Sequence, residues 1–225
     1  MSLYAISDLH LSLSTEKPMD IFRGWENHTK RIENNWKRIV KDEDTVILPG
    51  DFSWGLKLSE TIEDFKFLNS LPGKKILLKG NHDLWWSTAA KVNAFFEENK
   101  INTVSILFNN AVLAEGRAIC GTRGWMYDAG ADSKIRKREV GRLKMSLEAA
   151  KKLSGEPLVF LHYPPVYGDF VCEDILEVLR EYNITTVYHG HIHGSGFNKS
   201  VPRYEEFTFK LISADCIDFS PILIP

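Results

Sequence analysis

The chain is poor in cysteine, with only Cys120, Cys172 and Cys216 among its 225 residues. An odd number of widely spaced cysteines does not form a disulfide framework, which excludes a small secreted domain held together by cross-links. We expect all three to be small core residues with free thiols. Free thiols are typical of a reducing compartment, so the sequence predicts a cytoplasmic protein.

An excess of charge of either sign is also missing, because 28 Lys and Arg face 30 Asp and Glu, a net charge of -2. No global basic field attracts the chain to a nucleic acid or an anionic membrane. No apolar run reaches the roughly 18 residues of a membrane span. The first thirteen residues contain Asp8 and His10, which a secretory signal lacks. We therefore expect no membrane partner and no nucleic acid partner, and any anion site must be built locally.

What is present fits one globular domain over residues 1–225, with 44% apolar and 26% charged residues. Short apolar runs alternate with helical patterns, and several runs are too continuously apolar to have a solvated face. Strands buried on both faces with helices between them predict an α/β layered domain. Helices are expected around 25–39, 62–68, 140–150 and 175–179, and strands at Leu3–Ser7, Thr45–Leu48, Lys75–Leu78, Val104–Leu107, Val112–Ala114, Leu158–Leu161, Thr185–Tyr188 and Phe207–Ile212.

Chemically active side chains follow five of these strands at their carboxyl ends, where α/β sheets place ligand sites. A single block of this kind is more often a turn or a core residue whose hydrogen bonds are satisfied. Here five blocks follow one another, and they include five of the seven histidines, so coincidence is a poor explanation. The residues are Asp8 and His10 after the first strand, Asp51 after the second, Asn81, His82 and Asp83 after the third, His162 after the sixth, and His191 and His193 after the seventh.

The spacing of these residues favours a metal site. Asp8 and His10 are separated by one residue, so in an extended segment both side chains point to the same side, and His191 and His193 repeat this spacing. Carboxylate and imidazole ligands without thiolate suit Mn, Fe, Zn or Mg. Asp51 can bridge two ions.

The five blocks resemble the signature of the calcineurin-like metallophosphoesterase superfamily: Asp-x-His, Gly-Asp, Gly-Asn-His-Asp/Glu, His and Gly-His-x-His, here over residues 8 to 193. The resemblance implies a four-layer α/β/β/α sandwich with two divalent metal ions at one edge of its sheets. It also implies a catalytic role for His82 beside the phosphate. By the same resemblance, one ion would be held by Asp8, His10, Asp51 and His193, and the other by Asp51, Asn81, His162 and His191.

The second block departs from the pattern of many members, which continue as Gly-Asp-x-x-Asp. Trp54 occupies the place of the second aspartate, a carboxylate that often orients the catalytic histidine. Asp83 is a candidate replacement. The Asp-Arg-Gly extension of protein phosphatases is also missing, which disfavours that activity.

The expected activity is hydrolysis of a small phosphomonoester or phosphodiester, with nucleotides among the candidates. Two ions about 3.5–4 Å apart can bridge a hydroxide and present it in line with phosphorus, while His82 protonates the leaving oxygen. A nuclease is an alternative that the charge of -2 disfavours. A non-catalytic metal-binding scaffold is another, although no ligand is missing. The sequence leaves the substrate, the metal and the oligomeric state open.

Other residues near the blocks are harder to assign. The basic run 134–144 is either the solvated face of a helix or part of a lid or rim insertion around 122–146 that grips a second phosphate. His28 is expected to be exposed, and His189 buried. Candidates for contact with the substrate or for support of the site are Asp83, Trp54, Trp85, Arg123 and Tyr163.

Overall fold

The computed structural model describes residues 1–126 and 133–225, and its main elements are two β-sheets. The five-stranded sheet has the order β13-β1-β2-β3-β4, and the six-stranded sheet has the order β11-β12-β10-β7-β6-β5. A short ribbon pairs β8 (Val166–Tyr167) with β9 (Phe170–Val171). The strands of the two sheets are β1 (Leu3–Ala5), β2 (Thr45–Leu48), β3 (Lys74–Leu77), β4 (Val104–Ile106), β5 (Val112–Ala114), β6 (Arg117–Thr122), β7 (Glu156–Leu161), β10 (Thr186–His189), β11 (Arg203–Tyr204), β12 (Phe207–Leu211) and β13 (Ile222–Ile224).

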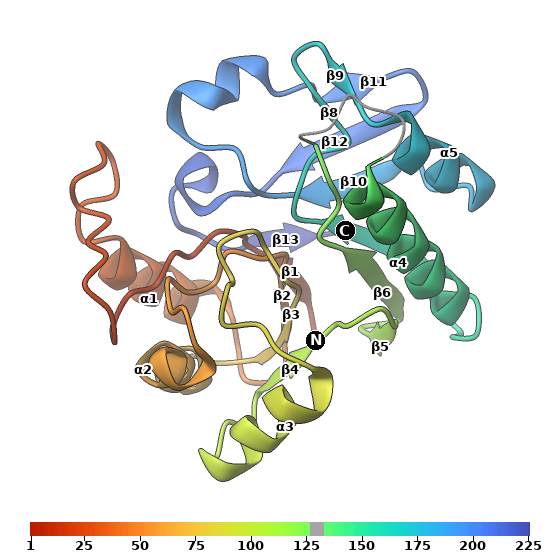
Figure 1. Ribbon diagram of the computed structural model, residues 1–225. Helices are drawn as coiled ribbons and strands as arrows, with labels where there is room; N and C mark the ends of the chain where they lie inside the picture. The colour runs from red at the N-terminus through yellow and green to blue at the C-terminus, as the bar shows by residue number, and fades with distance from the viewer. Residues whose placement is uncertain (127–132) are drawn as a thin grey trace.

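Helices cover the outer face of each sheet (Figure 1). On the five-stranded sheet they are α1 (His28–Ile39), α2 (Ile62–Ser70) and α3 (Ala89–Glu98), and on the six-stranded sheet α4 (Lys134–Ala150) and α5 (Glu173–Glu181). Short 3₁₀ turns lie at Leu58–Thr61, Gly194–Lys199 and Ala214–Ile217. The order of layers is helix, sheet, sheet, helix, which confirms the four-layer α/β/β/α sandwich.

Alternating side chains of the strands build three apolar layers. In β2, Val46 and Leu48 face α1 and α2, whereas Ile47 faces the other sheet. In β7, Val159 packs toward α4 and α5, and Phe160 packs into the layer between the sheets. Because successive residues of a strand point to opposite faces, a strand between two layers must be apolar at every position. The continuous apolar runs of the sequence have this cause.

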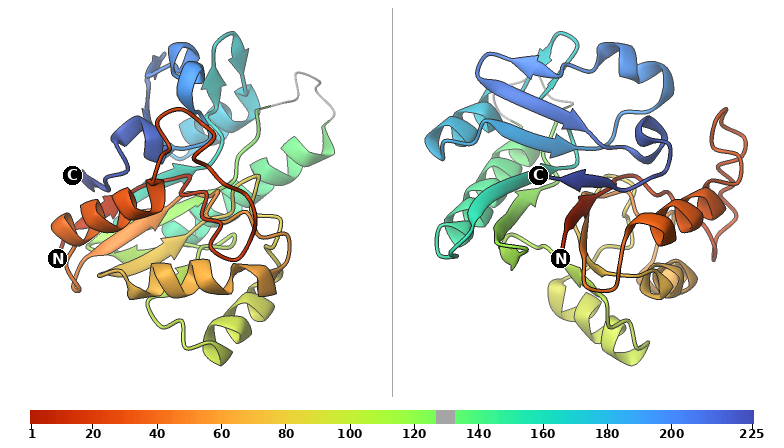
Figure 2. Two further views of the ribbon diagram at one scale, coloured as in Figure 1. Left: turned by 90° about the vertical axis from the view of Figure 1, so that its left-hand side faces the viewer. Right: turned by 180° about the vertical axis from the view of Figure 1, so that it is seen from behind.

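The parallel strands of both sheets end at one common edge. The strands β1 to β4 run parallel, as do β6, β7, β10 and β12. Beyond their ends the two sheets meet, where the Ser7 N–H donates to Ile212 O at 2.8 Å and the Ala214 N–H donates to Ser7 O at 2.9 Å. The loops that carry the five polar blocks therefore converge at this edge. Figure 2 shows the two chain termini close together, as the pairing of β1 with β13 requires.

Several sequence expectations were wrong. The strand β6 and the helix α3 were missed, and a 3₁₀ turn precedes the helix α2. His28 is buried against the rings of Trp25 and Phe219, and Cys216 is exposed. His189 is buried, as expected. Among the described residues, none of the helices has the length and apolar character needed to span a membrane.

The basic run 134–144 lies entirely in α4, whose Leu143 and Leu147 pack into the core beside β6. Arg136 is buried and forms an ion pair with Asp174, so it does not belong to a solvated face. The expected lid or rim at 122–146 includes residues 127–132, which lie outside the described residues.

Candidate metal centre

The loops after β1 and β2 run side by side and hold two carboxylates close together. The Asp8 N–H donates to Gly50 O at 3.0 Å, and the His10 N–H donates to Asp51 O at 3.0 Å. Asp8, His10, Asp51 and His191 all have positive φ, between 46° and 71°. Non-glycine residues are rarely held in this region, and such strain collects at functional sites. It falls here on four of the predicted metal ligands.

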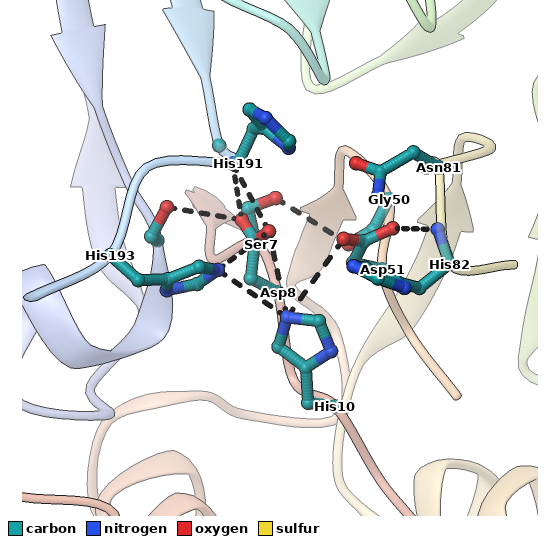
Figure 3. A network of polar contacts seen from close by, with 12 residues as sticks. Ser7, Asp8, His10, Gly50, Asp51, Asn81, His82, His191 and His193 are labelled. Atoms are coloured by element: carbon teal, nitrogen blue, oxygen red, sulfur yellow. Dashed lines mark hydrogen bonds and ion pairs between the residues drawn. The ribbon is translucent and has the colours of Figure 1, made fainter. Parts of the chain in front are cut away.

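The first ligand group consists of Asp8, His10 and His193, whose donor atoms lie within 4.8 Å of one another. His193 Nε2 is 3.3 Å from Asp8 Oδ1 and 3.3 Å from His10 Nε2. In Figure 3 His10 lies below both carboxylates, with contacts to Asp8, Asp51 and His193. The two imidazole nitrogens converge on one carboxylate, as shared coordination of an ion requires.

The second ligand group consists of Asp51, His162 and His191, again within 4.8 Å. His162 Nδ1 donates to Pro49 O at 3.0 Å, so Nε2 is the nitrogen that faces the site. Asn81 Oδ1 lies 2.7 Å from His162 Nε2 and adds a neutral oxygen to this group. The structure thus brings together all seven predicted ligand residues.

Asp51 lies between the two groups. Its Oδ2 is 3.8 Å from His10 Nε2 and 3.4 Å from His162 Nε2. A single carboxylate oxygen that faces one nitrogen from each group is in the position of a bridging ligand.

Two glycines allow the chain to approach these carboxylates closely. A Cβ at Gly80 would lie 2.1 Å from Asp51 Oδ1, and a Cβ at Gly190 would lie 2.1 Å from Asp8 Oδ2. Both distances are well below any contact that a side chain tolerates, so each block needs glycine before its ligand.

The buried charges of the centre depend on one another. Burial raises the pKa of Asp8, but the hydrogen bond and charge of His193 lower it well below its usual range. Burial lowers the pKa of His162, but the carboxylate of Asp51 raises it to about 9. Two buried carboxylates side by side require positive charge. Protonated histidines supply this positive charge when no metal is bound. Divalent ions can supply it as well, because they bind the same oxygen and nitrogen donors.

The ring of His82 packs beside the first ligand group. Its backbone N–H donates to Asp51 Oδ1 at 2.7 Å, and its ring centroid lies 4.4 Å from that of Trp54. Trp54 also stacks on His10 with the ring centroids 4.9 Å apart. An indole therefore packs on His82 where the pattern Gly-Asp-x-x-Asp would place an aspartate.

Asp83 does not replace that aspartate. Its buried carboxylate accepts hydrogen bonds from the backbone N–H groups of Gly80, Asp51, Phe52 and Ser53, and from the indole of Trp85. It thereby fixes the loops that carry Asp51 and Asn81, rather than the ring of His82. Burial and the charge of Asp51 raise the pKa of Asp83 to about 6.

A cavity of about 420 Å³ opens beside His10, His82 and His193. Trp54 lines it, whereas Trp85 and Tyr163 are buried in the protein. The Tyr163 ring packs edge-on against His191, with centroids 4.4 Å apart. Among the lining residues that sequence reasoning missed are Arg23, Trp25 and Asp215.

The family model described as calcineurin-like phosphoesterase matches residues 1–195. The chain belongs to this family. No curated protein matches this chain.

Solved structures with the same fold have low sequence identity to this chain. AQ665 from Aquifex aeolicus, a protein of unknown function, is 20% identical, with a TM-score of 0.52 over 99% of this chain and 95% of the other. The phosphopantetheinyl hydrolase PptH from Mycobacterium tuberculosis is 15% identical, with a TM-score of 0.51 over 94% and 88%. TT1561 of Thermus thermophilus is 12% identical, with a TM-score of 0.55 over 99% and 88%. At these identities the likeness concerns the fold.

Asp215 contacts one of the histidines of the candidate metal centre. Its Oδ1 lies 2.8 Å from His193 Nδ1, and its Oδ2 accepts the Gly194 N–H at 3.1 Å. Although burial opposes the charge of His193, this hydrogen bond and that with Asp8 raise its pKa to about 10. A carboxylate behind a ligating histidine fixes the ring and its tautomer. The signal in the sequence was the same as for the other blocks, a polar residue after a strand.

We expect Asp215→Asn to weaken the binding of Mn²⁺ by roughly 10–100-fold, the usual cost of losing such a partner. Titration calorimetry of Mn²⁺ into metal-free protein measures the change. Asp218→Asn is the matched control, because Asp218 is an exposed carboxylate three residues further along. Equal affinities of Asp215→Asn and the unaltered protein would contradict the orienting role.

Proposed function

We propose that this protein is a metal-dependent phosphoesterase that hydrolyses a small phosphomonoester or phosphodiester, nucleotides included, at a centre of two divalent ions. The observation that carries the proposal is the position of Asp51 Oδ2, which faces His10 Nε2 at 3.8 Å and His162 Nε2 at 3.4 Å. One oxygen in contact with both ligand groups supports two ions that share a ligand, rather than one isolated ion.

In this proposal Asp8, His10 and His193 hold one ion, and Asn81, His162 and His191 hold the other, with Asp51 shared between them. When bound, the two ions activate a water molecule and offset the negative charge that develops on the phosphoryl oxygens. The chain itself fixes the ligands. The His191 N–H and the Ser213 hydroxyl donate to Asp8, at 3.0 and 3.1 Å.

His82 is the proposed proton donor to the leaving oxygen. Its half-buried ring lines the cavity of about 420 Å³, beside the first ligand group. Burial lowers the pKa of His82. The negative charge of a phosphate in the cavity acts in the opposite direction and favours the protonated ring. Trp54 holds the ring in place by packing rather than by a hydrogen bond.

Metal analysis of the purified protein, combined with turnover of a generic monoester, a generic diester and a panel of nucleotides, tests this function. We expect His82→Ala to retain its metal and to lose roughly 10²–10⁴-fold in turnover, the usual contribution of a positioned proton donor. Leu84→Ala is the control, since Leu84 is an exposed residue of the same loop. Bound metal without turnover of any ester would instead favour the non-catalytic scaffold.

A further inference from the structure

We propose that the substrate carries a second anionic group, a phosphate or a carboxylate, which binds in a separate cationic cavity between the ends of β3, β4 and β6. This inference rests on the proposed function, because it assigns a substrate class to the same centre. The cavity measures about 250 Å³, below the usual size of a pocket for a drug-sized ligand. Its volume suits one small charged group.

Two residues that line the cavity are linked through the backbone to members of the second ligand group. Lys79 lines it and is followed directly by Gly80 and Asn81. Arg123 also lines it, and its backbone carbonyl accepts the N–H groups of His162 at 3.2 Å and of Tyr163 at 2.8 Å. The cavity has no lining residue in common with the one beside His82. The two cavities are therefore built by different residues.

The lining is strongly positive for its size. Lys79, Arg123 and Arg142 line the cavity together with one carboxylate, that of Glu139, which leaves a net charge of +2. The buried Glu139 carboxylate is satisfied by Arg142, Arg123 and the Thr122 hydroxyl. If this network around Glu139 only stabilised the fold, it would need no third cation. Lys79 is the lining cation that forms no ion pair with Glu139.

Lys79 and two neighbours offer unused hydrogen-bond donors. The half-buried Lys79 forms no hydrogen bond and no ion pair with the residues that the structure describes. Trp86 Nε1 and Arg123 Nε, both on residues that line the cavity, are buried and lack a hydrogen-bond partner among the described residues. Buried donors without partners cost free energy, and the ammonium of Lys79, which lines the cavity, is the donor available to an anion there.

The helix α3 adds a further attraction for an anion. Its N-cap residue Thr88 and the preceding Ser87 line the cavity. The first N–H groups of a helix have no partner within the helix, and the helix dipole favours negative charge at this end. Together with the three cations, this end of α3 makes an anion the chemically matched occupant.

Binding of non-hydrolysable phosphonates to the metal-loaded protein tests the proposal without requiring turnover. The probes are α,ω-alkyl bisphosphonates with two to six carbons, each compared with the monophosphonate of the same length by titration calorimetry. We expect at least one bisphosphonate to bind at least about tenfold more tightly than its matched monophosphonate, through charge-assisted hydrogen bonds.

Lys79→Gln should abolish this advantage, and Lys79→Arg should retain it. Arg138→Gln is the matched control, because Arg138 is exposed on α4 and does not line the cavity. Circular dichroism checks that each variant is folded. The proposal is overturned if no bisphosphonate has the advantage, or if the advantage survives in Lys79→Gln, as it would if both groups merely chelated the metal.

Inorganic phosphate distinguishes a free anion from a group of the substrate. Phosphate binding that depends on Lys79, without any advantage of a bisphosphonate, would assign the cavity to a separate anion and overturn the proposal. The unaltered protein could also hydrolyse none of the esters while its preference for the bisphosphonate depends on Lys79. That result would count against the proposed hydrolysis and leave the anion cavity supported.

Discussion

Asp51→Asn should lower both the metal content and the rate of phosphoester hydrolysis, the rate by at least about a hundredfold. Loss of a partner behind a ligand already costs roughly 10–100-fold, and Asp51 is itself the carboxylate between His10 and His162. An asparagine keeps the shape and removes the negative charge that a shared ligand supplies. We expect the content of bound metal to fall from two ions per chain toward one.

Metal analysis by mass spectrometry and turnover of a generic monoester measure this effect. Asp42→Asn is the control, since Asp42 is an exposed carboxylate close to β2, which carries Asp51 at its other end. A circular dichroism spectrum equal to that of the unaltered protein would show that the fold is intact. Full metal content with full activity in Asp51→Asn would contradict both the ligand assignment and the proposed function.

Asp83→Asn should destabilise the fold more than any exposed substitution, by about 3 kcal/mol or more. The buried carboxylate accepts four backbone N–H groups and one indole N–H. The amide of asparagine turns one acceptor into a donor, which then faces other donors. Backbone N–H groups around Asp51 and Gly80 would lose their partners in the interior.

Urea denaturation in the presence of EDTA measures this loss without a contribution from bound metal. Asp169→Asn, an exposed carboxylate in the loop between β8 and β9, is the matched control. Unfolding free energies that agree between the Asp83 variant and the unaltered protein would show that the loops do not depend on this carboxylate.

The elements that the sequence predicted best are strands formed by short, mainly apolar runs. Thr45–Leu48 and Val112–Ala114 were placed at their observed bounds, and each of the other expected strands overlaps an observed one. The missed strand β6 has the sequence Arg-Ala-Ile-Cys-Gly-Thr, in which small residues interrupt the apolar pattern. It is buried because α4 covers one face and the other sheet covers the opposite face. The burial of β6 is a tertiary effect with a weak local signal.

The ligand residues were predictable because parallel strands end at one edge of a sheet. To locate each block, it was enough to recognise in the sequence the strand that precedes it. The partners of these ligands were harder to predict. Asp215 meets His193 across 22 residues, and Arg23 and Trp25 reach the cavity from a segment before α1. Such contacts depend on how loops pack against one another, and local sequence periodicity does not predict this packing.

The sequence by itself determined the family, the order of the five blocks and the set of seven candidate ligands, because these depend on residue type and on position after a strand. Only the tertiary structure decided that Asp83 supports loops instead of orienting His82, since its five donors come from residues up to 32 positions away. It also decided that Lys79, Arg123 and Arg142 surround one cavity. The physical reason is that charges from the loops after β3 and β6 and from α4 come together only when the two sheets pack.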